Sequence, residues 1–407
     1  MGSSVPLRWP GVWSDPSALS LLKGSAVNCI LVERGDVAAQ ARQEGLQVVH
    51  AASFPSGVSV VKGQWPGVKL SESGAVDQAA AGPTGLPWVD SNGWRVRLAS
   101  ALHPAATVWV DAAPPKGAQL SSDSYLIAVA DAAAHGGQWI ISLGDQLAQD
   151  IAGQKPEALR TWNLLTRAAG FFAAQRPWSA YVPEAVVGIV SDFSGGNEFL
   201  SSEILNLVAR ANQQYLVLLK ARISEAPLGG LRALLYPDAE PPAQEVRKRV
   251  LAFVEAGGTL ITGRQWGELP GTLAAGEVHP RYAWRVLGKG RVAIAKAALD
   301  DPYRVANDSV ILVSHRHDLL RFWNPGAVSS RLTVAPDRKR AVAQMVFYAS
   351  ARVADGPTVR VVGRYRTARL LTLDQPAARS VEMVAQKDAV ELHLPQVAVY
   401  AGVELEA

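Results

Sequence analysis

The 407-residue sequence contains a single cysteine, Cys29, and this scarcity removes several kinds of site. One cysteine cannot form a disulfide within the chain, and it cannot build a cysteine-based zinc site. No apolar run approaches 18 residues, so we predict no membrane-spanning helix and no membrane partner. The first residues lack both the basic stretch and the apolar core of a signal peptide. A cytoplasmic protein and an exported protein whose signal has been removed are both compatible with this sequence.

An excess of charge of one sign is also missing. The chain has 40 basic and 36 acidic residues, a formal net charge of only +4. Arginines cluster between Arg331 and Arg369, but they alternate with apolar residues, as on the wet face of a sheet. This pattern favours a solvated face over a surface for anions or nucleic acid, and we predict no nucleic-acid partner.

Several familiar catalytic motifs are absent as well. Residues 287–291, Leu-Gly-Lys-Gly-Arg, lack the phosphate-loop spacing and predict a hairpin turn. No Gly-x-Ser-x-Gly elbow is present, which disfavours a serine hydrolase. His315 and His317 would share one face of a strand, but two ligands do not make a metal site. We therefore predict neither a metal nor an organic cofactor.

Composition, length and sequence pattern together predict a folded α/β protein with more than one domain. Hydrophobic residues make up 48% of the chain, and 407 residues are enough for two or three domains. Residues 1–180 alternate apolar strands with helical stretches, which indicates a (β/α) barrel-like domain. One helix is predicted over 121–135, with Ser and Asp near its start and Gly136 and Gly137 after it. A complete eight-stranded barrel usually needs about 250 residues, so this barrel is expected to be degenerate.

The pattern changes twice along the chain. Residues 184–298 predict a doubly wound α/β domain, with strands near 185–190, 215–219, 231–236 and 259–262, and helices over 197–211 and 241–255. Pro241 and Pro242 precede the second helix, and Gly257 and Gly258 follow it. Residues 300–407 predict alternating strands without a helix, beginning at 310–313, and hence a β-sandwich.

Carboxylates follow the apolar segments of the first region. The three segments at 27–32, 107–110 and 138–142 are followed by Glu33, Asp111 and Asp145, and a turn-rich aromatic stretch contributes Asp90. In α/β folds, catalytic groups gather at the C-terminal ends of parallel strands. Glycoside hydrolysis commonly needs two carboxyl groups, one of which must stay protonated. The alternative is that each carboxylate simply caps a helix or a turn.

Aromatic and polar residues near these carboxylates are candidates for sugar binding. An indole ring packs well on the apolar face of a sugar and keeps its N–H free to donate. The candidate stacking residues are Trp65, Trp88 and Trp94, and the candidate hydrogen-bonding residues are Lys62, Asn92 and Arg95. Glu198 follows Ser194-Gly195-Gly196 and opens a helix, where it either caps that helix or faces the site from the neighbouring domain.

Three segments carry a family resemblance: Leu-Leu-Tyr-Pro-Asp at 234–238, Glu-Ala-Gly-Gly-Thr-Leu at 255–260 and Val-Ala-Val-Tyr at 397–400. With the order of the three regions, they make the chain resemble β-galactosidase-type glycoside hydrolases, which join a (β/α) barrel, an amidotransferase-like domain and a β-sandwich. Because residues 184–298 contain no cysteine, glutaminase activity is not expected. The resemblance implies that this middle domain acts in packing or in homo-oligomerisation.

These patterns together predict a glycoside hydrolase that acts on an oligo- or polysaccharide by carboxylate acid/base catalysis. Asp145 and Glu33 are the preferred pair, with Asp90 or Asp111 in support. The alternative is a non-catalytic glycan-binding or assembly protein that retains the hydrolase architecture. A pocket with two carboxyl groups favours the enzyme, and an open tryptophan-lined groove without them favours binding.

Overall fold

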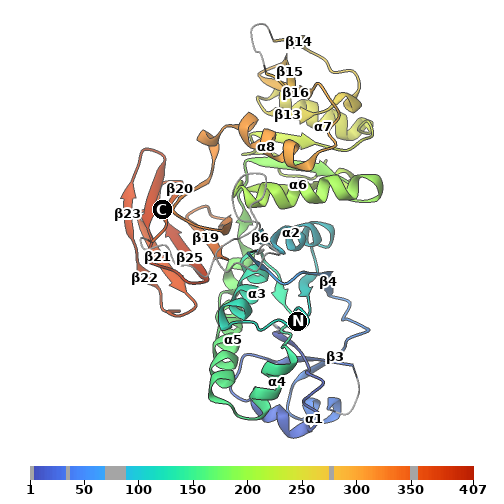
Figure 1. Ribbon diagram of the computed structural model, residues 1–407. Helices are drawn as coiled ribbons and strands as arrows, with labels where there is room; N and C mark the ends of the chain where they lie inside the picture. The colour runs from blue at the N-terminus through green and yellow to red at the C-terminus, as the bar shows by residue number, and fades with distance from the viewer. Residues whose placement is uncertain (1–3, 34–36, 69–88, 275–278, 349–355) are drawn as a thin grey trace.

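The computed structural model describes residues 4–33, 37–68, 89–274, 279–348 and 356–407, and it shows a mixed α/β protein with several sheets (Figure 1). The predicted mixed α/β class with more than one domain is confirmed. The domain boundaries drawn from the sequence remain predictions.

In the described ranges, the N-terminal part contains six short parallel strands. They are β1 (Pro6–Arg8), β2 (Cys29–Val32), β3 (Gln47–His50), β4 (Val58–Lys62), β7 (Thr107–Asp111) and β8 (Gln138–Trp139). They make two three-stranded sheets, β1-β2-β3 and β4-β7-β8. A parallel bridge between Leu7 and Ile141 joins the two sheets. The strand order across the joined sheets is therefore β3-β2-β1-β8-β7-β4.

The side chains of these strands meet in a common apolar core. Cys29, Leu31, Val49, Trp109 and Ile140 are buried in one cluster, and side chains of β4 pack against it, so strands from both ends of the order meet there. The six strands must therefore curve around this cluster rather than lie flat. Between β3 and β4, no strand pairing occurs in the ranges that the structure describes.

Among the residues that the structure describes here, five helices connect or follow these strands. They are α1 (Ala38–Gln43), α2 (Gly93–Leu102), α3 (Ser122–Ala134), α4 (Asp145–Ala152) and α5 (Pro156–Ala174). Shorter elements are the 3-10 helices η1 (Pro16–Leu22) and η2 (Arg176–Ala180), and the paired strands β5 (Gly67–Val68) and β6 (Val89–Asp90). The predicted helix before the third apolar segment is α3. The Ser121 hydroxyl caps it by accepting from the Ser124 N–H, and Gly136 follows it with a positive φ of 92°.

The middle part is a seven-stranded sheet in the order β11-β10-β12-β13-β16-β15-β14. Its strands are β10 (Val187–Ser191), β11 (Tyr215–Leu219), β12 (Ala233–Tyr236), β13 (Thr259–Thr262), β14 (Thr272–Leu273), β15 (Tyr282–Leu287) and β16 (Gly290–Ala295). The first five strands in this order are parallel. Residues 287–291 form the predicted hairpin turn, with Leu287 paired to Gly290.

Helices cover both faces of this sheet. Helix α6 (Glu198–Arg210) and helix α8 (Pro302–Val313) bury their apolar side chains in one cluster. Helix α7 (Gln244–Glu255) buries Val246, Val250 and Val254 in a second cluster on the other face. This part of the chain therefore extends to Val313.

The expectation of a strand at 310–313, and of no helix after 300, is wrong. Pro302 occupies the first turn of α8, and the Asp301 carboxylate accepts from the N–H groups of Tyr303 and Arg304. The buried positions Val305, Ala306, Ser309, Leu312 and Val313 recur at helical spacing. The β-branched run at its end suggested a strand, but the cap and the packing against α6 determine a helix.

The C-terminal part contains two antiparallel sheets, in the orders β17-β20-β24-β23 and β22-β21-β25-β19-β18-β9. The strands are β9 (Val182–Pro183), β17 (Leu320–Trp323), β18 (Val328–Val334), β19 (Arg340–Phe347), β20 (Thr358–Val362), β21 (Thr367–Thr372), β22 (Arg379–Ser380), β23 (Glu382–Ala385), β24 (Ala389–His393) and β25 (Tyr400–Glu406). Both sheets contribute to one apolar cluster, which includes Val361 and Met345. The outer face of the larger sheet packs on α3 and α5 (Figure 1).

The sequence of strand β19 is almost continuously apolar because both faces of the strand are buried. Ala343 and Met345 point into the core between the two sheets, whereas Val342 and Val346 pack with residues of α3 and α5. A strand buried on both faces loses the alternation that marks a half-exposed strand. The C-terminal sheets are therefore joined to the N-terminal part by an apolar interface.

Candidate functional site

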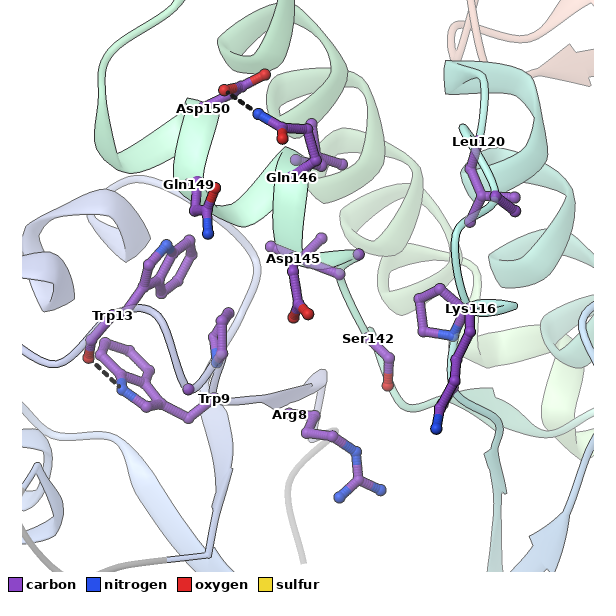
Figure 2. Close-up of a pocket in the computed structure, with 18 of the residues that line it drawn as sticks. Arg8, Trp9, Trp13, Lys116, Leu120, Ser142, Asp145, Gln146, Gln149 and Asp150 are labelled. Atoms are coloured by element: carbon purple, nitrogen blue, oxygen red, sulfur yellow. Dashed lines mark hydrogen bonds between the residues drawn. The ribbon is translucent and has the colours of Figure 1, made fainter.

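A cleft of about 1280 Å³ opens at the C-terminal ends of β1, β2, β7 and β8 (Figure 2). Its lining includes Arg8 at the end of β1 with Trp9 and Trp13 after it, Glu33 after β2, residues 113–120 after β7, and residues 142–147, 149 and 150 after β8. Parallel strands end at the same edge, so the loops that follow them necessarily meet there. Glu33 and Asp145, which were selected because each follows an apolar strand, therefore line the same cleft.

Asp145 is the first residue of α4, and its carboxylate points into the cleft between Trp9 and Arg8 (Figure 2). This side chain is exposed, and the N-terminal end of the helix favours its negative charge. The preceding Gly144 is held by its N–H, which donates to the Tyr125 hydroxyl at 3.1 Å. Tyr125 is buried, and burial raises its pKa, so the phenol stays protonated.

Glu33 directly follows β2 and is also exposed. Strand β2 is held against the chain that follows β1, because the Trp9 N–H donates to the Leu31 carbonyl at 2.9 Å. Within the described ranges neither Glu33 nor Asp145 forms a salt bridge. The two carboxylates are therefore available to a ligand in the cleft.

Asp111 has a different role from these two. It ends β7, and its carboxylate accepts from Arg8 Nη2 at 2.6 Å. Arg8 lines the cleft, whereas Asp111 is not part of the lining. The ion pair holds the Arg8 guanidinium at the ends of β1 and β7, where it can donate to a ligand.

Two tryptophans that were not selected from the sequence belong to this cleft. Trp9 and Trp13 contact each other edge to face, with ring centroids 5.2 Å apart. The Trp9 Nε1–H donates to the Trp13 carbonyl, and the Trp13 Nε1–H donates to the Ala148 carbonyl. Trp13 is buried, and Trp9 is partly exposed beside Asp145 (Figure 2). Strand β1 has only three residues, so the sequence carried no periodic signal for the loop that holds them.

The tryptophans selected as stacking residues lie elsewhere. Trp65 packs edge to face against Tyr125 and Trp139, at 5.4 Å in each case, and is not part of the cleft lining. Trp94 is only 5% exposed and packs in the apolar cluster of the middle sheet. Trp88 lies outside the described residues. The apolar neighbours of Trp65 and Trp94 were not visible from the glycine- and proline-rich local sequence.

The selected polar residues also lie outside the cleft lining. Asn92 is fully buried, and its side chain donates to Asp131 and to the Gln64 carbonyl. The Arg95 guanidinium lies over the Trp94 ring at 4.3 Å. Lys62 ends β4 and is exposed.

Two acidic candidates are likewise placed away from the cleft lining. Asp90 belongs to β6, and its charge acts on the guanidinium of Arg210 on α6. Glu198 is exposed at the first residue of α6, on the middle sheet, in the position expected of a residue that favours a helix start.

The structure bears on metal and membrane binding as well. Across the described ranges, no group of three or more His, Cys, Asp or Glu side chains is placed to hold a metal ion. His315 and His317 lie in a 3-10 helix rather than on the expected strand, and His315 Nδ1 contacts Asp318 at 2.9 Å. None of the helices that the structure describes has the length and apolar character that crossing a membrane requires.

The chain matches no protein-family model and no curated protein. Its structure is similar to α-L-fucosidase isoenzyme 2 from Paenibacillus thiaminolyticus, with 13% identity and a TM-score of 0.57, covering 95% of this chain and 78% of the fucosidase. A rhamnosidase from Novosphingobium sp. PP1Y matches with 11% identity and a TM-score of 0.55, covering 91% of this chain and 38% of that one. A β-galactosidase from Rahnella sp. R3 matches with 11% identity and a TM-score of 0.53, covering 93% of this chain and 63% of the β-galactosidase.

This chain thus spans less than two thirds of the rhamnosidase and of the β-galactosidase. At such low identity the similarity concerns the fold, not the chemistry. The resemblance inferred from the sequence is confirmed at that level: the chain has the architecture of β-galactosidase-type glycoside hydrolases.

Proposed function

We propose that this protein is a β-galactosidase-like glycoside hydrolase that acts on an oligo- or polysaccharide in the cleft at the strand ends. One observation carries the proposal: Glu33 and Asp145, the pair selected from the strand-end pattern, line the same cleft together with Trp9. The names of the structural neighbours, a fucosidase, a rhamnosidase and a β-galactosidase, support a carbohydrate as the ligand.

The positions of the two carboxylates suggest different roles. Asp145 begins a helix, a position that favours the anion, so we assign it as the base or nucleophile. Glu33 then donates the proton to the leaving oxygen. Trp9 offers the exposed part of its ring to the apolar face of a sugar, and Arg8 donates to a hydroxyl while Asp111 holds it.

The finer domain assignments belong to the same proposal. Six parallel strands in the order β3-β2-β1-β8-β7-β4 support a reduced (β/α) barrel in residues 1–180. Helices on both faces of the middle sheet support an amidotransferase-like domain in residues 184–298, to which we add α8. The two antiparallel sheets support a β-sandwich in the C-terminal part. Homo-oligomerisation through the middle domain stays a prediction.

The second candidate function is a glycan-binding protein without catalysis. The exposure of Glu33 and Asp145 favours it, because a catalytic acid is usually kept protonated by burial. The six-stranded barrel favours it too, because two strands and their loops, which would contribute to a complete site, have no counterpart in the described ranges.

Hydrolysis of a panel of aryl glycosides and oligosaccharides separates the two functions. The wild-type protein is compared with Asp145→Asn and Glu33→Gln, and with Glu157→Gln as a control carboxyl change at the exposed start of α5. The hydrolase predicts a loss of at least about 10²-fold in kcat in both cleft variants, and wild-type rates in the control. Sugar binding without turnover on any substrate would favour the second candidate and refute the first.

A further inference from the structure

Two arginines and a histidine from distant parts of the chain come together where the three parts of the protein meet. Arg97 lies on α2, His135 follows α3, and Arg331 lies on β18. We call these three residues the junction cluster. Tyr215, the first residue of β11, completes the contact: Arg97 lies 3.6 Å above its ring and donates to its carbonyl.

The Arg331 side chain reaches the same place from the C-terminal part. A Cβ atom added to Gly136, the residue next to His135, would lie 2.7 Å from Arg331 Nη1. The absence of a side chain at Gly136 therefore leaves room for the guanidinium. On β18, Arg331 alternates with the apolar residues of the sandwich core, so it faces away from that core and toward the junction.

The positive charge of the junction cluster is not neutralised. Over the described ranges, neither Arg97 nor Arg331 forms a salt bridge, and the two guanidiniums lie within each other's field. Burial, together with the charge of Arg97, lowers the pKa of Arg331 to about 10. Burial and both arginines hold the pKa of His135 well below its ordinary value. Two like charges in a poorly solvated place are costly unless an anion accompanies them.

A chain of hydrogen bonds determines which nitrogen of His135 carries the proton. The Tyr348 hydroxyl donates to Asp131 at 2.5 Å, so the Ser329 hydroxyl donates to Tyr348 at 2.9 Å. The Ser329 oxygen is then free to accept from His135 Nε2–H, at 3.3 Å. Nδ1 of the neutral ring therefore carries no hydrogen and is an acceptor.

This acceptor has no partner in the described part of the chain. His135 is only 3% exposed, and its Nδ1 atom is buried without a hydrogen bond. Arg331 Nε, a donor, is also buried without a partner. More than nine in ten buried polar groups in proteins are hydrogen-bonded, so two such atoms beside two guanidiniums that have no carboxylate partner in the described ranges point to a missing anionic ligand.

We propose that the junction cluster binds a phosphate ion, with its anionic oxygens on Arg97 and Arg331 and its remaining O–H donated to His135 Nδ1. Phosphate keeps at least one O–H near neutral pH, whereas sulfate has none, so phosphate matches both the donors and the acceptor. Both arginines are partly exposed, which gives a small ion access from solvent. Bound phosphate would link α2, α3 and β18, and so hold the N-terminal and C-terminal parts together.

Phosphate binding is measured by isothermal titration calorimetry at pH 7.5, with the ionic strength held constant by sodium chloride. We expect one phosphate per chain, and sulfate binding that is weaker by at least about 10-fold, because it leaves Nδ1 without a donor. Arg331→Met is expected to weaken phosphate binding by at least about 10-fold, since it removes a charge-assisted contact. Arg331→Lys keeps a positive charge, so it is expected to lose less phosphate affinity than Arg331→Met does.

The control is Arg360→Met. Arg360 lies on β20, away from the junction cluster, and forms an ion pair with Asp388. This variant should bind phosphate as the wild-type protein does. Phosphate should also raise the Tm of the wild-type protein above its value in sulfate, and should not do so in Arg331→Met. If Arg331→Met fails to fold, the comparison of phosphate with sulfate binding to the wild-type protein tests the proposal by itself. Absence of saturable phosphate binding, or equal binding of sulfate, would overturn the proposal.

Discussion

Replacement of Asp131 by asparagine tests the buried contact between the N-terminal and C-terminal parts. Asp131 lies on α3 with no exposed surface, and its carboxylate accepts from the Asn92 backbone at 2.8 Å, the Asn92 side chain at 2.9 Å and the Tyr348 hydroxyl at 2.5 Å. Asparagine has nearly the same shape and keeps an acceptor oxygen, but it does not titrate. The substitution removes the titration, so the difference in pH dependence between the two proteins measures the contribution of the carboxyl proton.

The size of the effect follows from the pKa of Asp131. Burial raises this pKa from its ordinary value of 3.8 to about 6, although the bonds from Tyr348 and Asn92 favour the carboxylate. The folded state therefore holds the proton more tightly than the unfolded state does. At 1.36 kcal/mol for each pKa unit, this corresponds to about 3 kcal/mol of stability. That contribution is fully present below pH 3.8 and is lost as the pH rises through about 6.

Urea unfolding at pH 4, 5, 6 and 7 measures this loss, with the free energy of unfolding taken from the transition that includes α3. We expect the wild-type protein to lose about 2 kcal/mol more between pH 4 and 7 than Asp131→Asn does, because part of the full contribution is already lost at pH 4. Asp123→Asn, which removes an exposed carboxyl group from the first turn of the same helix, serves as the control. An equal pH dependence in the wild-type protein and in Asp131→Asn would refute the reasoning.

Two further substitutions test contacts in the middle part of the chain. Lys220→Met leaves the fully buried Asp238 without the ammonium group that lies 2.6 Å away, and should lower the free energy of unfolding in urea by about 3–5 kcal/mol; a loss below about 1 kcal/mol would show that the pair contributes little. Asp301→Ala removes the cap of α8 and should cost about 1 kcal/mol, measured as a lower urea midpoint with an unchanged slope. An unchanged midpoint would contradict the capping role.

Local sequence was sufficient where a residue's neighbours along the chain determine its conformation. The cap at Ser121 and the glycine after α3 are local signals, and they predicted that helix closely. The strand-end positions of Glu33 and Asp145 also follow from sequence, because parallel strands place their C-terminal ends at one edge whatever their order. Two members of the candidate site could therefore be selected before any contact was known.

Other features were decided by contacts between residues far apart in the sequence. Helix α8 ends in a β-branched run that suggests a strand, but burial against α6 requires a helix there. Trp94 has the local sequence of an exposed loop, yet it packs in the core of the middle part, whereas Trp9 reaches the cleft from a three-residue strand that has no periodic pattern.

The junction cluster shows the same limit most clearly. Arg97 and Arg331 are 234 positions apart in the printed sequence, and each is separately compatible with a solvated arginine on a helix or a strand. Only the folded structure, in which side chains of β18 contact His135 and Gly136 after α3, brings their charges together. Sequence determined the local elements and the edge at which the carboxylates gather, because short-range sterics and periodicity act along the chain. Tertiary structure decided which side chains share a cleft, a core or a charge cluster, because burial and electrostatics depend on neighbours that the chain brings together only when it folds.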